Sequence, residues 1–190
     1  MSNKPINIKQ RLGQFSYALF TLIFLLPLVL WAQSSPSNYQ DEILTERQVD
    51  SIRLKLLMEK SSQLYFSKPD SAMIVAQEAI DLATKLDFKE DLGYAHKNLG
   101  LAYYVNGDYA QTMDAWENSL KIFEEIDFKL GMSNLQNNIG AVYQTRGDDA
   151  KALDFFLKSV KNAEAISDTL RISTAYLNIG TVYVNDKNTY

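Results

Sequence analysis

The sequence predicts an all-α protein in which antiparallel helical hairpins stack in chain order. Three observations predict this fold: a 40-residue repeat, apolar residues spaced as in amphipathic helices, and a glycine-aspartate pair in the middle of the repeat. The chain has 190 residues and no cysteine. Disulfides therefore cannot stabilise it, and apolar packing between helices must hold the fold together.

The first 32 residues are expected to be an export signal that is not part of this fold. Three basic residues and no acidic one precede a charge-free apolar stretch at residues 15–32. Cleavage after Ala32 fits the small and aliphatic residues, Ala32 and Leu30, that signal peptidase recognises. The alternative is an uncleaved anchor, because these 18 residues reach the lower limit for crossing a bilayer. Both readings place the rest of the chain outside the cytoplasm, either in the periplasm or cell envelope or anchored to the inner membrane.

The remainder of the chain divides into a polar segment and an array of repeats. The 16 basic and 23 acidic residues after position 32 leave a formal charge of −7, which repels phosphate backbones. We therefore expect no nucleic-acid partner, and membrane contact only through residues 15–32 if they are not cleaved. The expected segments are a linker or N-terminal polar segment at 33–48 and repeats over 49–190, in copies at about 49–90, 91–130, 131–170 and an incomplete 171–190.

The repeat is most visible around three glycines. Asn-Leu-Gly at 98–100 recurs as Asn-Ile-Gly at 138–140 and at 178–180. A tyrosine follows each glycine by three residues. The copy at 49–90 is degenerate, because Lys60 replaces the glycine, and its first helix is expected to be irregular.

Each copy reads as two helices joined by a short turn. In the first half of one copy Ala95, Leu99 and Ala102 share a helical face, and in the second half Trp116 and its apolar neighbours do the same. A Gly-Asp pair separates the halves at 107–108 and again at 147–148. Glycine can adopt a positive φ to end the first helix, and aspartate can cap the second.

These motifs together closely resemble the tetratricopeptide repeat. The resemblance rests on Gly100 followed by Tyr103, on the Gly-Asp turn, and on small residues flanking Trp116 or Phe156 in the second helix. It covers about three quarters of the chain and implies a right-handed superhelical stack, an α-solenoid. The family's usual period is about 34 residues, so a 40-residue period implies longer helices.

The resemblance also implies a function, which is protein or peptide binding without enzymatic activity in these residues. In the family the first helices line a concave groove, and the residue two before the glycine faces it: here Asn98, Asn138 and Asn178. A carboxamide can pair with the backbone of an extended peptide. Alternatively, these asparagines satisfy backbone groups of the neighbouring helix. The other residues expected in the groove are Tyr94, Lys97, Tyr104, Asn134, Asn137, Gln144 and Asn185.

Lys97 and the asparagines resemble the family's clamp for a terminal carboxylate. That clamp is incomplete here, because Leu101 and Ala141 stand where further polar groups would be needed. No catalytic residues, metal site or cofactor are predicted. The single histidine, His96, is expected to pack, and the acidic run at 148–149 is expected to cap a helix.

The last copy stops where its second helix would begin, after residue 186. An apolar face would then lie open, whereas repeat arrays normally end in a polar capping helix. We therefore expect an amino-terminal portion of a longer protein and possible self-association through the open repeat. The alternative function is the extracytoplasmic sensor region of a signalling protein, such as a histidine kinase or a helix-turn-helix regulator.

Overall fold

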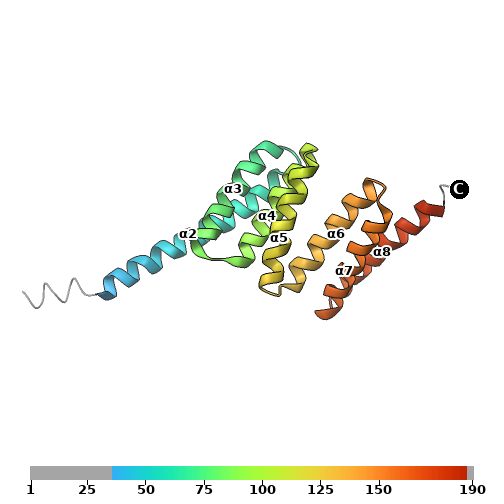
Figure 1. Cartoon of the computed structure of the whole chain (residues 1–190). Helices are drawn as coiled ribbons and strands as arrows, with labels where there is room; N and C mark the ends of the chain where they lie inside the picture. Colours follow the sequence, from blue (N-terminus) through green and yellow to red (C-terminus); the bar gives the residue numbers. More distant parts are fainter. Residues whose placement is uncertain (1–35, 188–190) are drawn as a thin grey trace, which may run out of the picture. The chain divides into compact units, whose positions relative to one another are not determined.

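The computed structural model describes the backbone of residues 36–187 and the side chains of residues 45–184. The predicted export signal at 1–32 lies outside the described residues. The described part is entirely helical (Figure 1), which confirms the all-α prediction. Its helices are α2 (Pro36–Leu64), α3 (Pro69–Leu86), α4 (Lys89–Asn106), α5 (Tyr109–Glu125), α6 (Lys129–Thr145), α7 (Asp149–Ala165) and α8 (Thr169–Lys187).

The helices pack in sequence order within one compact unit, Asp50–Tyr190. Helix α4 pairs with α5 and helix α6 with α7, each as an antiparallel hairpin. Consecutive hairpins meet through α3 and α4, through α5 and α6, and through α7 and α8. The predicted stack of hairpins is therefore what the chain forms.

Helix α2 differs from the irregular first helix expected in the first copy. It is a continuous helix that already begins at Pro36, inside the segment expected as a polar linker. Lys60 stands at the glycine register of this helix. The large aromatic residue of the second helix is replaced in this copy by Ala76, which is fully buried, so the first helix needs no glycine opposite it.

In the next two hairpins a glycine admits an aromatic ring between the helices. A Cβ on Gly100 would lie 2.3 Å from the Trp116 indole, and a Cβ on Gly140 would lie 2.7 Å from the Phe156 ring. Both aromatic side chains are almost fully buried, at 1% and 0% exposure. The recurring glycines therefore mark where the two helices of a hairpin enclose a ring.

The turns within hairpins follow the prediction. Gly107 and Gly147 have φ values of 87° and 76°, in the left-handed region where a side chain would cost energy. The Asp148 side chain accepts a hydrogen bond from the Lys151 amide and so caps α7. Asp108 instead accepts a hydrogen bond from the Asn106 side chain.

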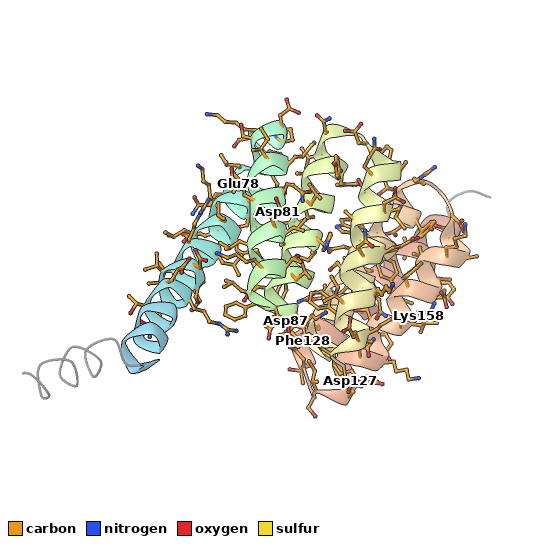
Figure 2. The ribbon with its side chains drawn as sticks, turned by 60° about the vertical axis from the view of Figure 1, so that its left-hand side comes forward. Glu78, Asp81, Asp87, Asp127, Phe128 and Lys158 are labelled. Carbon is orange, nitrogen blue, oxygen red and sulfur yellow. The ribbon has the colours of Figure 1, made fainter. Side chains whose placement is uncertain are left out.

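The turns between hairpins use the left-handed region without glycine. Asp87, Asp127 and Ser167, each 40 positions from the next, have φ values of 55°, 52° and 55°. Figure 2 places Asp87 and Asp127 at the same end of the helices. Aspartate tolerates this conformation better than most residues, because its short side chain bonds locally.

No helix in the described part of the chain is both long enough and apolar enough to cross a membrane.

Candidate functional site

The first helices of successive hairpins contact one another, whereas the second helices stay further apart. Helix α4 touches α6 and α6 touches α8, but α5 and α7 make no comparable contact within the described residues. In a stack of hairpins, the helices that crowd together lie on the inner side of the curve. We call the surface formed there by Tyr94, Lys97, Asn134, Asn137 and Arg171 the first-helix face.

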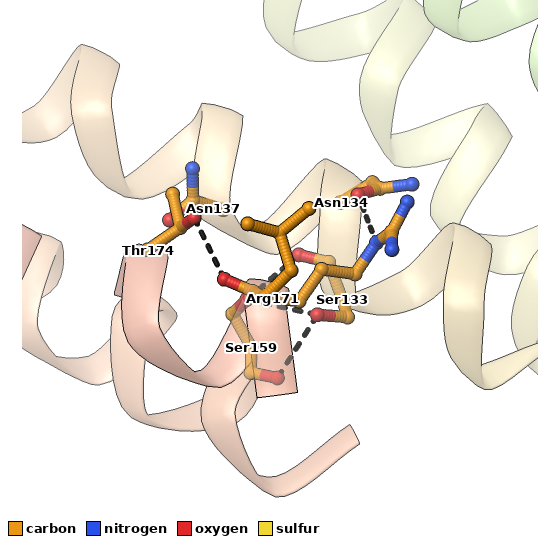
Figure 3. A pocket seen from close by; sticks show the side chains of 7 residues that line it. Ser133, Asn134, Asn137, Ser159, Arg171 and Thr174 are labelled. Carbon is orange, nitrogen blue, oxygen red and sulfur yellow. Dashed lines mark hydrogen bonds between the residues drawn. The ribbon is translucent and has the colours of Figure 1, made fainter. Parts of the chain in front are cut away.

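A pocket of about 190 Å³ lies at one end of this face, between α6, α7 and α8. Figure 3 shows its polar lining. Two of the predicted groove residues, Asn134 and Asn137, contribute to it from α6. The residues around the pocket are Ser133, Asn134, Asn137, Ser159, Leu170, Arg171 and Thr174.

Arg171 organises the polar side of this pocket. Its Nε donates to the Asn134 Oδ1 at 2.7 Å, and its Nη1 pairs with the Asp168 carboxylate (Figure 3 shows the contact with Asn134). Asp168 also accepts a hydrogen bond from the Arg171 amide, and this bond holds the pKa of the Asp168 carboxyl below its usual value. The guanidinium is therefore held in place between two helices.

Lys97 is the cation on this face that lacks a counter-ion. Its side chain is half-buried, and its ammonium lies 5.2 Å from the centre of the Tyr94 ring. Among the described residues no carboxylate pairs with it. Burial lowers the pKa of the Lys97 ammonium, and the positive charge of Arg171 lowers this pKa further. Lys97 and Arg171, which come from α4 and α8, therefore act on the same region.

The two predicted groove tyrosines are partly used in packing. The Tyr94 ring meets Phe123 and Phe128 edge-on, with centroids 5.2 and 5.9 Å away. Burial raises the pKa of the Tyr94 phenol. Tyr104 stacks on Trp116 with a centroid distance of 6.2 Å. Each ring thus supports the face from the side that turns toward α5.

The three repeated asparagines occupy different environments. Asn98 is buried, and its Nδ2 donates to the Met58 carbonyl at 3.3 Å and to the Ser61 Oγ at 3.0 Å. Asn178 donates to the Asn137 Oδ1 at 2.8 Å. Asn138 is half-buried. Asn98 and Asn178 therefore link one first helix to the preceding one, which is the alternative role that the sequence left open for this position.

The remaining predicted residues lie apart from the pocket. Gln144, near the end of α6, has a buried Nε2 atom without a hydrogen-bond partner among the described residues. Asn185 belongs to α8, but its side chain lies outside the described part. The Nδ1 atom of His96 is likewise buried and unpartnered in that part, and burial lowers the pKa of its imidazole.

Arg171 was missed by sequence reasoning. The repeat register aligns it with Gly131 and Asp91, which share no chemistry with it, so the period gave no reason to select it. Its signal was local instead, because Asp168 at the start of α8 stands three positions before it. No cluster of acidic or histidine side chains in the described residues is arranged to hold a metal ion.

Comparison with known proteins identifies the repeats. A family model described as "Tetratricopeptide repeat" matches residues 91–165. The solved structure of BtubC (BKLC) from P. vanneervenii matches with a TM-score of 0.57 and 17% identity, over 68% of this chain and 56% of that one. At that identity the match shows a shared fold only, and this chain spans little more than half the length of BtubC. A comparison with curated proteins gives no match.

Proposed function

Because this chain is a tetratricopeptide-repeat protein, we propose that it is a scaffold that holds an extended, acidic segment of a partner protein on the first-helix face. Tetratricopeptide repeats generally serve as protein-interaction scaffolds and not as catalysts. The observation that carries this proposal is the half-buried ammonium of Lys97, which has no carboxylate partner in the described part of the chain.

An unpaired, partly buried charge is unfavourable for the protein alone. Lys97 loses part of its hydration and gains only the contact with the Tyr94 ring in return. Arg171 adds repulsion, because its charge acts on the same region. A carboxylate brought by a partner would compensate both cations in a setting where water screens them weakly. This favours acidic side chains over neutral or basic ones.

The asparagines of α6 support an extended partner. Asn134 and Asn137 accept hydrogen bonds through their side-chain oxygens, from Arg171 and from Asn178 respectively. Their amide nitrogens therefore remain as donors, which suit the carbonyl oxygens of a peptide backbone or further carboxylates. An extended segment presents such acceptors at regular intervals, whereas a helix uses its own.

A direct test uses a fluorescein-labelled peptide of six glutamates with an amidated carboxyl end, so that only side chains carry negative charge. We expect saturable binding to the 190-residue chain, and weaker binding of the same peptide length in lysine. Lys97→Met should weaken hexaglutamate binding by roughly 5- to 30-fold, the loss expected for one partly desolvated ion pair. The matched control is Lys121→Met on the exposed surface of α5, which should change binding less than twofold.

The assignment fails if hexaglutamate and hexalysine bind equally, or if Lys97→Met binds hexaglutamate as tightly as Lys121→Met does. Circular dichroism of both variants should give the helical spectrum of the unsubstituted chain. Loss of binding together with loss of helicity would call for Lys97→Gln, which keeps a polar group at the same position.

We propose in addition that the repeats work outside the cytoplasm. The support is the order of a basic start and the apolar stretch at residues 15–32. Fractionation of bacterial cells expressing the tagged chain should place it in the envelope fraction, and deletion of residues 2–32 should return it to the cytoplasm. Recovery of the undeleted chain from the cytoplasm would contradict export.

A further inference from the structure

One side of α8 is open at the register where the other first helices hold an aromatic ring. A Cβ on Gly100 or Gly140 would collide with the rings of Trp116 or Phe156, but a Cβ on Gly180 would meet nothing within 4 Å. Gly180 therefore keeps the form of a ring-admitting position without a ring.

The neighbours of Gly180 share this exposure. Ser173 is exposed, although the equivalent Ser133 in α6 is fully buried. Four large apolar side chains follow the same helical side at intervals of three and four residues. We call this surface the α8 face; besides Ser173 and Gly180 it comprises Tyr176, Leu177, Tyr183 and Val184, which are 52%, 73%, 56% and 58% exposed.

The two complete hairpins define what covers such a face. In α5 the covering residues are Thr112, Trp116 and Ser119, and α7 repeats this spacing with Ala152, Phe156 and Ser159. Both helices thus carry a small residue, an aromatic one four positions later, and a serine three positions after that. All six residues are almost fully buried.

The serine of this pattern makes the same contact in both hairpins. Ser119 Oγ donates to the Gly93 carbonyl at 2.7 Å, and Ser159 Oγ donates to the Ser133 carbonyl at 2.8 Å. Gly93 and Ser133 are the register equivalents of Ser173 in α8. The carbonyl of residue 173 is therefore the expected acceptor for a serine of the covering helix.

From this equivalence we infer that the α8 face receives an amphipathic helix of a partner protein that carries the pattern small-x-x-x-aromatic-x-x-serine, with its ring seated over Gly180. This surface is separate from the first-helix face, and the inference goes beyond the proposed function. Burial of the four exposed apolar side chains supplies the free energy, and the ring and the serine set the register.

A second copy of this chain is a poor source of that helix. Within the described residues the pattern occurs in α5 and α7, and both rings are already buried in their own hairpins, at 1% exposure for Trp116 and 0% for Phe156. Helix α3 has alanine, Ala76, at the aromatic position. A second copy would have to open a hairpin to offer its ring, so a separate partner helix is favoured.

The test uses the 190-residue chain and a fluorescein-labelled peptide with the sequence of residues 148–168, which contains the pattern around Phe156. Saturable binding by fluorescence anisotropy is the expected result. The peptide with Phe156→Ala should bind at least about 30-fold more weakly, because it lacks the central aromatic anchor. Equal binding of the two peptides would overturn the inference.

A variant of the chain tests the location. Gly180→Met fills the seat of the ring, and because a Cβ there meets nothing, the variant should fold normally. It should weaken peptide binding at least about tenfold. The matched control Ala110→Met adds the same side chain at an exposed position of α5 and should leave binding unchanged.

Two further measurements distinguish the α8 face from the first-helix face and from a dimer interface. Lys97→Met should not alter binding of the α7 peptide, so failure of the first-helix proposal would leave this one standing. Sedimentation should give a monomer for the unsubstituted chain. A dimer that Gly180→Met converts to monomer would mean that a second copy covers the face, which would overturn the assignment of a partner helix.

Discussion

At the scale of single residues, a glycine in this chain has a meaning that depends on what stands opposite it. Gly140 and Gly180 occupy the same register of the repeat, yet one faces a buried ring and the other faces open space. The sequence alone makes them look equivalent. The structure separates them, and the difference predicts opposite effects of one substitution.

We predict that Gly140→Ala lowers the free energy of unfolding by about 1–2 kcal/mol, because the new methyl group would lie 2.7 Å from the Phe156 ring and 3.2 Å from the Ala152 carbonyl oxygen. Gly180→Ala should instead raise it by about 0.5–1 kcal/mol, the gain in helix propensity where nothing obstructs the methyl group. Urea denaturation followed by circular dichroism measures both. Destabilisation by Gly180→Ala would show that its surroundings are not open.

His96 gives a second prediction at this scale. Burial lowers the pKa of its imidazole, so below its usual pKa of 6.5 the unfolded chain binds a proton more readily than the folded chain does. The folded state is therefore favoured at high pH and loses stability as the pH falls through about 6.5. Thermal melts at pH 7.5 and 5.5 should show this loss, and His96→Gln should reduce it. The Asp148 and Asp168 carboxyls do not interfere, because their pKa values are lowered from 3.8 and they titrate below this window.

Sequence reasoning reached part of the site at this scale. The repeat selected Lys97, Asn134 and Asn137 correctly as residues of first helices, but whether they bind a partner stays a prediction. It could not find the role of Asn98, because the acceptors of its hydrogen bonds lie in α2, about 40 positions earlier, where the repeat is degenerate. Contacts between helices that are distant in sequence follow from packing and not from local pattern.

At the scale of elements, the turns divide into two kinds that the sequence only half reveals. Glycine inside each complete hairpin announces the left-handed residue that ends a first helix. The turns between hairpins reach the same conformation through aspartate or serine, and nothing in these residue types signals a positive φ. Helix existence was therefore predictable, whereas the conformation of these connections was not.

The two kinds of turn predict opposite responses to substitution. Gly147→Ala should cost about 1 kcal/mol of stability, and since no atom lies within 4 Å of its Cβ position, the cost comes from the backbone conformation alone. Ser167→Gly should be neutral or stabilising by up to about 1 kcal/mol, because it removes a side chain from a φ of 55°. Chemical denaturation of the two variants, compared with the unsubstituted chain, checks the pair. A clear loss for Ser167→Gly would place its value in side-chain contacts instead.

At the scale of the whole molecule, the stacking of hairpins was predictable because it follows from one periodic feature. Each hairpin exposes apolar surface that only the next hairpin can cover, so a regular period implies a stack. The α8 face is a consequence of the same rule, since it has the form of a covered surface without its cover. The binding surface was less predictable, because it depends on Arg171, which breaks the period.

The central claim is that partners bind where the first helices meet. Mapping of amide chemical shifts in the isotope-labelled chain, with and without the amidated hexaglutamate peptide, tests it most directly. The account predicts that shifts gather on α4, α6 and α8, around Lys97, Asn137 and Arg171, and leave α3, α5 and α7 unchanged. Shifts gathered on the second helices instead would contradict it.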